Sequence, residues 1–194
     1  MKRGYQITAA LTALFLAGTA QAHTFGAHGA GFSAGLAHPF IGLDHLLAMV
    51  AVGVWAAQLG GRAIWRVPLA FMAMMALGSA LALGGVLLPA VETGIASSVL
   101  VLGLLIAVAA RFPLVASMLL VSVFALFHGH AHGQELPQAA SVLLYSLGFL
   151  LATGLLHATG AGLGILLGRG ISANWVRVMG GGIAATGLLL WVGV

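Results

Sequence analysis

The sequence has 194 residues, of which 61% are hydrophobic and 5% are charged, and its formal net charge at pH 7 is +4. Soluble domains carry about 25% charged residues, so a soluble enzyme is excluded. Nucleic acid is excluded as a partner because seven Lys and Arg residues cannot supply many clustered phosphate contacts. The composition predicts an all-α integral membrane protein with the lipid bilayer as its surroundings.

The residue types also limit the metal chemistry. The chain has no cysteine, so disulfides and thiolate metal sites are excluded. It has eight histidines, which are clustered in the sequence. Any metal must therefore be held by imidazole nitrogen or by oxygen.

The first 22 residues have the pattern of a secretory signal peptide. Residues 1–22 combine a basic start, a short apolar core and a final Ala-Gln-Ala. We predict cleavage after Ala22, which makes His23 the mature N-terminus; the alternative is an uncleaved first helix. Residues 23–194 then form a single polytopic domain. Its expected location is a bacterial inner membrane, with the mature N-terminus in the periplasm.

Six apolar stretches follow, and a span needs about 20 apolar residues. The fifth stretch is long for one straight span, so we expect it to tilt or to break near the glycines from Gly160 onward. Small residues at Gly160, Gly164 and Gly168, and again over residues 180–187, predict close helix packing. The predicted spans are residues 41–59, 67–88, 94–110, 113–128, 138–166 and 176–194.

The arginines indicate the orientation of these spans. Six spans that start from a periplasmic N-terminus leave Glu92 and Glu135 in periplasmic connections. All five arginines of the mature chain then lie in or beside cytoplasmic loops, as the positive-inside rule requires. These arginines are Arg62, Arg66, Arg111, Arg169 and Arg177.

The first polar motif is HPFIGLDH at residues 38–45. If a helix begins at Pro39, His38 and His45 lie on nearly the same face, and Asp44 can reach the same ion or a neighbouring helix. Asp and His are costly inside a membrane and usually face a cavity or a partner. The alternative is an Asp–His pair that only joins two helices.

The second motif is FHGHAHGQE at residues 127–135. Its alternating histidines do not predict a regular helix, and an extended strand would put all three on one side. If the helix continues instead, His128 and His132 share a face and Glu135 follows one turn later. Both geometries bring imidazoles and a carboxylate within reach of one ion; the alternative is a solvated polar loop. Under the predicted topology both motifs lie on the periplasmic side.

Imidazole with one or two carboxylates suits nickel, cobalt or zinc. Three further histidines are weaker candidates. His23 would pair its imidazole with a free amine, and His28 follows it closely. His157 lies well along the fifth stretch and is either a downstream metal ligand or a buried, hydrogen-bonded histidine. Methionines at 72, 74 and 75 are interpreted as packing residues rather than as a copper path.

The stretches HPFIGLDHLLAMVAVG at 38–53 and FHGHAHGQE at 127–135 resemble the HupE/UreJ family, bacterial membrane proteins found with hydrogenase and urease accessory genes. The resemblance covers essentially the whole chain. It implies a nickel or cobalt permease that supplies metalloenzymes, without a catalytic role or catalytic cofactor. The family's ligand positions fall on His38, Asp44, His45, His128, His130, His132 and Glu135.

We therefore predict transport of Ni²⁺, or Co²⁺, from periplasm to cytoplasm, with His23 assisting the two motifs. One alternative is a membrane metalloenzyme that uses the same ligands, which would also need a general base and a substrate cavity. Another is an accessory protein that binds metal on the periplasmic face without moving it. The oligomeric state and the energy source are left open.

Overall fold

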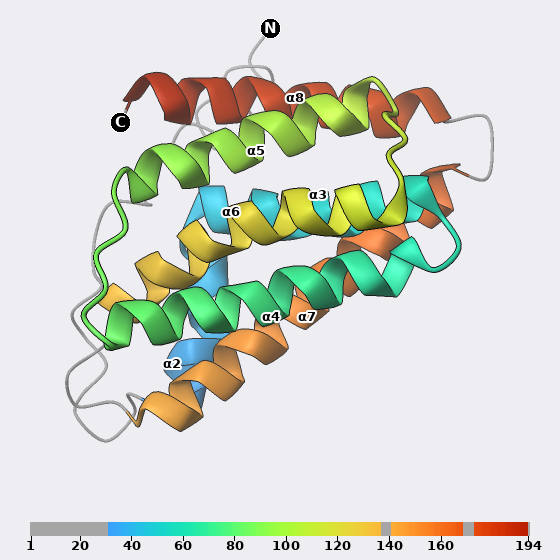
Figure 1. The fold of residues 1–194 in the computed structure, drawn as a ribbon. Coiled ribbons are helices and arrows are strands. Elements are labelled where there is room, and N and C mark those ends of the chain that lie inside the picture. Colours follow the sequence, from blue (N-terminus) through green and yellow to red (C-terminus); the bar gives the residue numbers. More distant parts are fainter. Residues whose placement is uncertain (1–30, 137–140, 169–172, 194) are drawn as a thin grey trace, which may run out of the picture.

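The computed structural model describes residues 31–136, 141–168 and 173–193, and every regular element in these ranges is helical. The predicted all-α class is confirmed. The predicted signal peptide at 1–22, together with His23 and His28, lies outside the described residues. The elements, shown in Figure 1, are α2 (Phe32–Ala37), the 3₁₀ turn η2 (His38–Phe40), α3 (Leu43–Leu59), α4 (Ala63–Leu83), α5 (Val91–Ala107), α6 (Leu114–Gln134), α7 (Val142–Gly168) and α8 (Ala173–Gly193).

The long helices match the six predicted apolar stretches, with ends that differ by a few residues. Helices α4, α6, α7 and α8 are long and apolar enough to cross a membrane. The α2–η2 segment and α3 together form a fifth apolar unit, and α5, with 17 residues, is shorter than a full span. The helices are those of a membrane protein, and the number of six spans stays a prediction.

The sequence suggested one continuous helix for the first motif, but the structure divides the motif between two segments. The segment Phe32–Phe40 and helix α3 meet at a bend of 82°. Between them Gly42 has an extended backbone, and α3 begins at Leu43. Pro39 begins no long helix, because it stands in the short 3₁₀ turn. The bend places His38 and His45 on two different segments.

Helix α6 continues through the second motif to Gln134, so the extended-strand and solvated-loop interpretations are wrong. A strand at membrane depth would leave its backbone N–H and C=O groups unpaired, whereas a helix pairs them internally. Helix α7 is likewise continuous over 27 residues. The predicted break near Gly160 does not occur.

Helix α6 packs against α4 through glycines of the histidine motif itself. A Cβ atom at Gly129 would overlap the backbone carbonyl of Met75, and one at Gly133 would overlap Ser79 and Ala82. Gly78 of α4 meets the α6 backbone at Leu126 in the same way. The helices approach this closely because these positions lack side chains, and the contact holds the histidine-bearing turns in place.

The other two main helix pairs are built on the same principle. Gly160 and Gly164 of α7 contact the α3 backbone at Val50 and Val54, as the small-residue stripe predicted. Gly168, the third glycine of that stripe, has no neighbour within contact distance among the described residues. Helix α8 packs on α5 through glycines at 180 and 187, whereas those at 181 and 182 face open space.

Charged side chains of the described residues are segregated between the two ends of the bundle, and Arg169 lies outside the described residues. Arg62 and Arg66 lie at the start of α4, and Arg111 lies between α5 and α6. Arg177, near the start of α8, donates through Nε to the carbonyl of Ala107 at the end of α5 (2.8 Å), so all four lie at one end. The three acidic residues, Asp44, Glu92 and Glu135, lie at the opposite helix ends.

Candidate metal site

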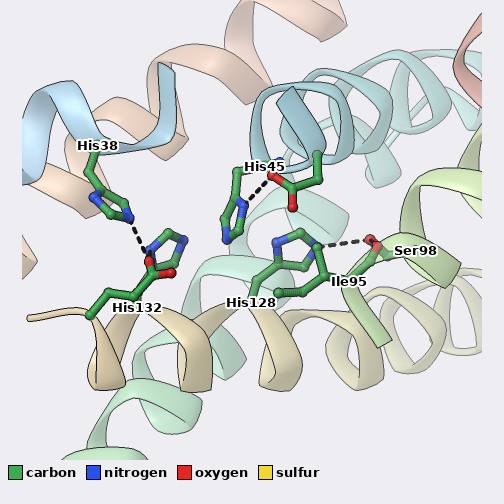
Figure 2. A network of polar contacts seen from close by, with 8 residues as sticks. His38, His45, Ile95, Ser98, His128 and His132 are labelled. Carbon is green, nitrogen blue, oxygen red and sulfur yellow. Dashed lines mark hydrogen bonds and ion pairs between the residues drawn. The ribbon is translucent and has the colours of Figure 1, made fainter. Parts of the chain in front are cut away.

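The two polar motifs meet where the bend before α3 faces the last turns of α6 (Figure 2). His38 stands on η2, and His45 on the first turn of α3. His128 and His132 lie on one face of α6, as residues four apart on a helix must. Residues almost a hundred positions apart in sequence therefore share one cluster.

The outer part of the cluster contains His38, His132 and Glu135. Nε2 of His38 donates to Oε2 of Glu135 at 3.0 Å, and Nδ1 of His132 lies 3.8 Å from the same oxygen. One ligand atom from each residue lies within 4.8 Å of the others. The exposed fractions of the side chains fall from 52% for Glu135 to 27% for His38 and 2% for His132. The group is a candidate metal site that leads from the surface inward.

His45 lies at the centre of the cluster. Its Nδ1 donates to Oδ1 of Asp44 at 2.7 Å, and its ring centroid lies 4.3 Å from that of His132 and 4.8 Å from that of His128. Because Nδ1 carries the hydrogen, Nε2 of the neutral ring is a free lone pair. This atom has no hydrogen-bond partner in the described part of the chain. A carboxylate behind a histidine is the usual support of a metal ligand.

The backbone at Gly42 leaves room for this Asp44–His45 pair. A methyl group at Gly42 would lie 2.8 Å from Oδ1 of Asp44 and 3.2 Å from Nδ1 of His45. Asp44 also stands in the first turn of α3, where the helix dipole favours a negative charge. Both features stabilise the carboxylate beside the imidazole.

Ser98 on α5 fixes the orientation of His128. The Ser98 hydroxyl donates to the carbonyl of Ile95 at 2.6 Å, so it accepts a hydrogen from Nε2 of His128 at 2.8 Å. Nδ1 of His128 is then the lone-pair nitrogen, and it is buried without a partner among the described residues. Figure 2 shows this nitrogen on the side of the ring that faces His45.

His130 is not brought into the cluster. It lies between His128 and His132 in sequence, but on a helix it points to another side, and its Nε2 donates to the carbonyl of Val86 at 2.8 Å. Of the ligand positions implied by the family resemblance, the structure therefore groups His38, Asp44, His45, His128, His132 and Glu135, and it separates His130.

A cavity of about 250 Å³ adjoins the cluster between α4 and α7. His132 and Tyr145 contribute to its wall, and the remaining lining is largely apolar. The ring of Phe149, another wall residue, packs against His132 with a centroid distance of 3.9 Å. The cavity therefore lies directly beside the His132 ring.

Several residues that support the cluster were not identified by the sequence analysis. Ser98 is a polar residue inside an apolar stretch, and this pattern was the one available indication of its role. Phe71 and Phe149, which pack against the imidazoles, are two of nine phenylalanines and are not distinguishable by type. The carbonyl of Met49, which binds His157, carries no side-chain signature.

Comparison with known proteins identifies the family of this chain. The family model described as "HupE / UreJ protein" matches residues 11–190. The chain is 49% identical to Protein HupE of Rhizobium leguminosarum bv. viciae over 188 residues, which cover 97% of this chain and 98% of the relative. No solved structure matches. On the family match and this identity, the chain belongs to the HupE/UreJ family.

Proposed function

We propose that this protein carries Ni²⁺, or Co²⁺, across the bacterial inner membrane into the cytoplasm and so supplies the maturation of metalloenzymes such as hydrogenase or urease. The observation that carries the proposal is the convergence of His38, His132 and Glu135 at the end of a helical membrane bundle. The membership of the HupE/UreJ family supports the same conclusion.

The donor set suits a borderline divalent cation. Imidazole nitrogens and carboxylate oxygens bind nickel, cobalt and zinc, whereas Cu(I) prefers sulfur ligands. In the metal-free chain a hydrogen of His38 joins its Nε2 to Glu135, and a cation at this place would replace that hydrogen. The carboxylates of Glu135 and Asp44 would offset the charge of the cation as water is removed.

The order of burial suggests a direction of movement. The cation would first meet Glu135 and His38, then His45 and His132, and then the free nitrogen of His128, which is fully buried. The arginines at the opposite end of the bundle favour a cytoplasmic location for that end by the positive-inside rule. The acidic end with the cluster would then face the periplasm.

Nickel flux into proteoliposomes tests the proposal. Purified protein is reconstituted into lipid vesicles that contain a nickel-sensitive dye, and Ni²⁺ is added to the external buffer. We expect flux with the wild-type protein and its loss in Glu135→Gln, which keeps the shape of the side chain but removes its charge. Wild-type protein that binds Ni²⁺ in detergent and gives no flux in sealed vesicles would instead identify a binding accessory protein.

A further inference from the structure

His157 is a buried histidine on α7 that the proposed path has not used. Its side chain is 2% exposed, and its Nδ1 lies 2.8 Å from the backbone carbonyl of Met49 on α3. A carbonyl oxygen only accepts, so Nδ1 carries the hydrogen and Nε2 of the neutral ring is a lone pair. Nε2 has no hydrogen-bond partner within the described ranges.

The backbone around His157 holds this geometry firmly. A Cβ atom at Gly53 of α3 would overlap the carbonyl of His157, so the two backbones are in direct contact. The imidazole is thus placed by backbone packing and by one hydrogen bond, and a free acceptor nitrogen is left in an apolar interior. Such an unpaired acceptor destabilises the fold unless something binds it. A backbone carbonyl on the other ring nitrogen is also how metal-binding histidines are commonly oriented.

His157 is connected to the cluster by one aromatic side chain. The ring of Phe71 on α4 lies 5.2 Å from the ring of His157 and 5.7 Å from that of His128, measured between centroids. Met49, the hydrogen-bond partner of His157, stands one helical turn after His45 on α3. His157 is therefore the next imidazole inward from His45 and His128. His130 also has a free ring nitrogen, but its fixed partner Val86 lies outside the cluster.

We infer that His157 is an inner metal ligand, which receives the cation through Nε2 after it leaves His45 and His128. The inference rests on the proposed function for the identity of the cation. The inner part of this path has three fixed imidazoles, each with one nitrogen bonded to the protein and the other free: His45, His128 and His157. A series of sites that each offer few ligands permits release as well as binding.

Two substitutions separate a ligand role from a structural role. His157→Asn puts an amide N–H where Nδ1 stands, so it keeps the donor to Met49 and removes the Nε2 lone pair. His157→Gln puts its amide near Nε2, so it keeps a weak oxygen ligand and loses that donor. The control is Thr153→Val, one turn earlier on α7, which removes the hydroxyl contact to Sδ of Met49 (3.4 Å) and changes no metal ligand.

The readouts are Ni²⁺ flux into proteoliposomes and equilibrium Ni²⁺ binding in detergent. For a ligand, we expect His157→Asn to reduce flux by about tenfold or more, to retain binding at the outer cluster, and to be less active than His157→Gln. Thr153→Val should transport as the wild type does. Two outcomes would show that His157 only joins α3 to α7. One is a wild-type flux in His157→Asn, and the other is an equal loss of flux in His157→Asn and Thr153→Val.

A second measurement uses the wild-type protein alone and needs no flux. Cu²⁺ is bound in place of Ni²⁺, ascorbate and oxygen are added, and oxidised histidines are located by peptide mass spectrometry, because a bound redox-active metal oxidises its own ligands. Oxidation of His157 that excess Ni²⁺ prevents supports the inference. Oxidation of His45 and His132 with His157 intact would overturn it. Absence of flux in the wild type, by contrast, would reject the transport function and leave this result standing.

Discussion

Oδ1 of Asp44 lies 2.7 Å from Nδ1 of His45 and 2.7 Å from the backbone nitrogen of the same residue. One carboxylate oxygen thus fixes both the start of α3 and the orientation of the central imidazole. A cation that binds His45 through Nε2 would gain from this carboxylate without touching it.

Substitution of Asp44 by Asn should weaken metal binding strongly. The amide has the shape of the carboxylate but no charge. It can turn its N–H₂ group toward His45, and Nδ1 of His45 would then accept a hydrogen bond instead of carrying the ring hydrogen. We expect nickel affinity to fall by about 10- to 100-fold. Isothermal titration with Ni²⁺ measures the change, and gel filtration in detergent checks the fold. An unchanged affinity would mean that the pair only stabilises the first turn of α3.

Two histidines of the same motif should behave differently. His132→Gln removes an imidazole from the cluster, and we expect it to abolish nickel flux. His130→Gln keeps an amide N–H near the position of Nε2, so it can still donate to the carbonyl of Val86. We expect this variant to transport at near the wild-type rate. Equal losses in the two variants would place His130 on the path and contradict the separation seen here.

Removal of the Ser98 hydroxyl should affect both stability and transport. In Ser98→Ala the buried Nε2–H of His128 loses its acceptor, which costs about 1–3 kcal/mol, and the ring is free to exchange its tautomer. We expect a lower unfolding temperature and a several-fold slower flux, both restored by Ser98→Thr. Ser117→Ala is a matched control, because this buried hydroxyl bonds to the carbonyl of Pro113 away from the cluster. A flux equal to wild type in Ser98→Ala would remove Ser98 from the site.

The glycines of the second motif should be as sensitive as its histidines. A methyl group in Gly129→Ala would overlap the carbonyl of Met75, so α6 must move away from α4. We expect a clearly lower unfolding temperature, measured by fluorescence-detected gel filtration after heating. The control Gly181→Ala adds a methyl group in open space and should be neutral. Equal stability of both variants would disprove the close α4–α6 contact.

Helices were the predictable part of this molecule. Long apolar runs such as those of α4 and α8 have no alternative to a helix in a bilayer, so composition alone located them. The bend at Gly42 was not predictable, because a single glycine with an extended backbone leaves the hydropathy pattern of the segment unchanged. The sequence left a helix as one of two geometries for the histidine motif, because the intrinsic helix propensity of its histidines and glycines is weak. Its stability comes from backbone contact with α4, which involves residues such as Gly78, about 50 positions earlier in the chain.

The site was predictable in its residue types and not in its geometry. Residue spacing grouped His128 with His132 and allowed Glu135 to join them. It could not distinguish a strand, with a period of two residues, from a helix, with a period of 3.6. The direction in which His130 points depends on that difference. The partners that fix each ring, the Ser98 hydroxyl and the Met49 carbonyl, come from other helices. Their positions depend on tertiary packing, which a single sequence does not display.

Glycine contacts also limit how this protein can change shape. Backbone touches backbone between α4 and α6, so these two helices must travel as one rigid body, as must α3 with α7. The imidazoles of His128 and His132 belong to the α4–α6 pair, and those of His45 and His157 belong to the α3–α7 pair. If one helix pair slid along the other, the distances between these two sets of nitrogens would all change together. A single shear movement of this kind would therefore be enough to release a bound cation.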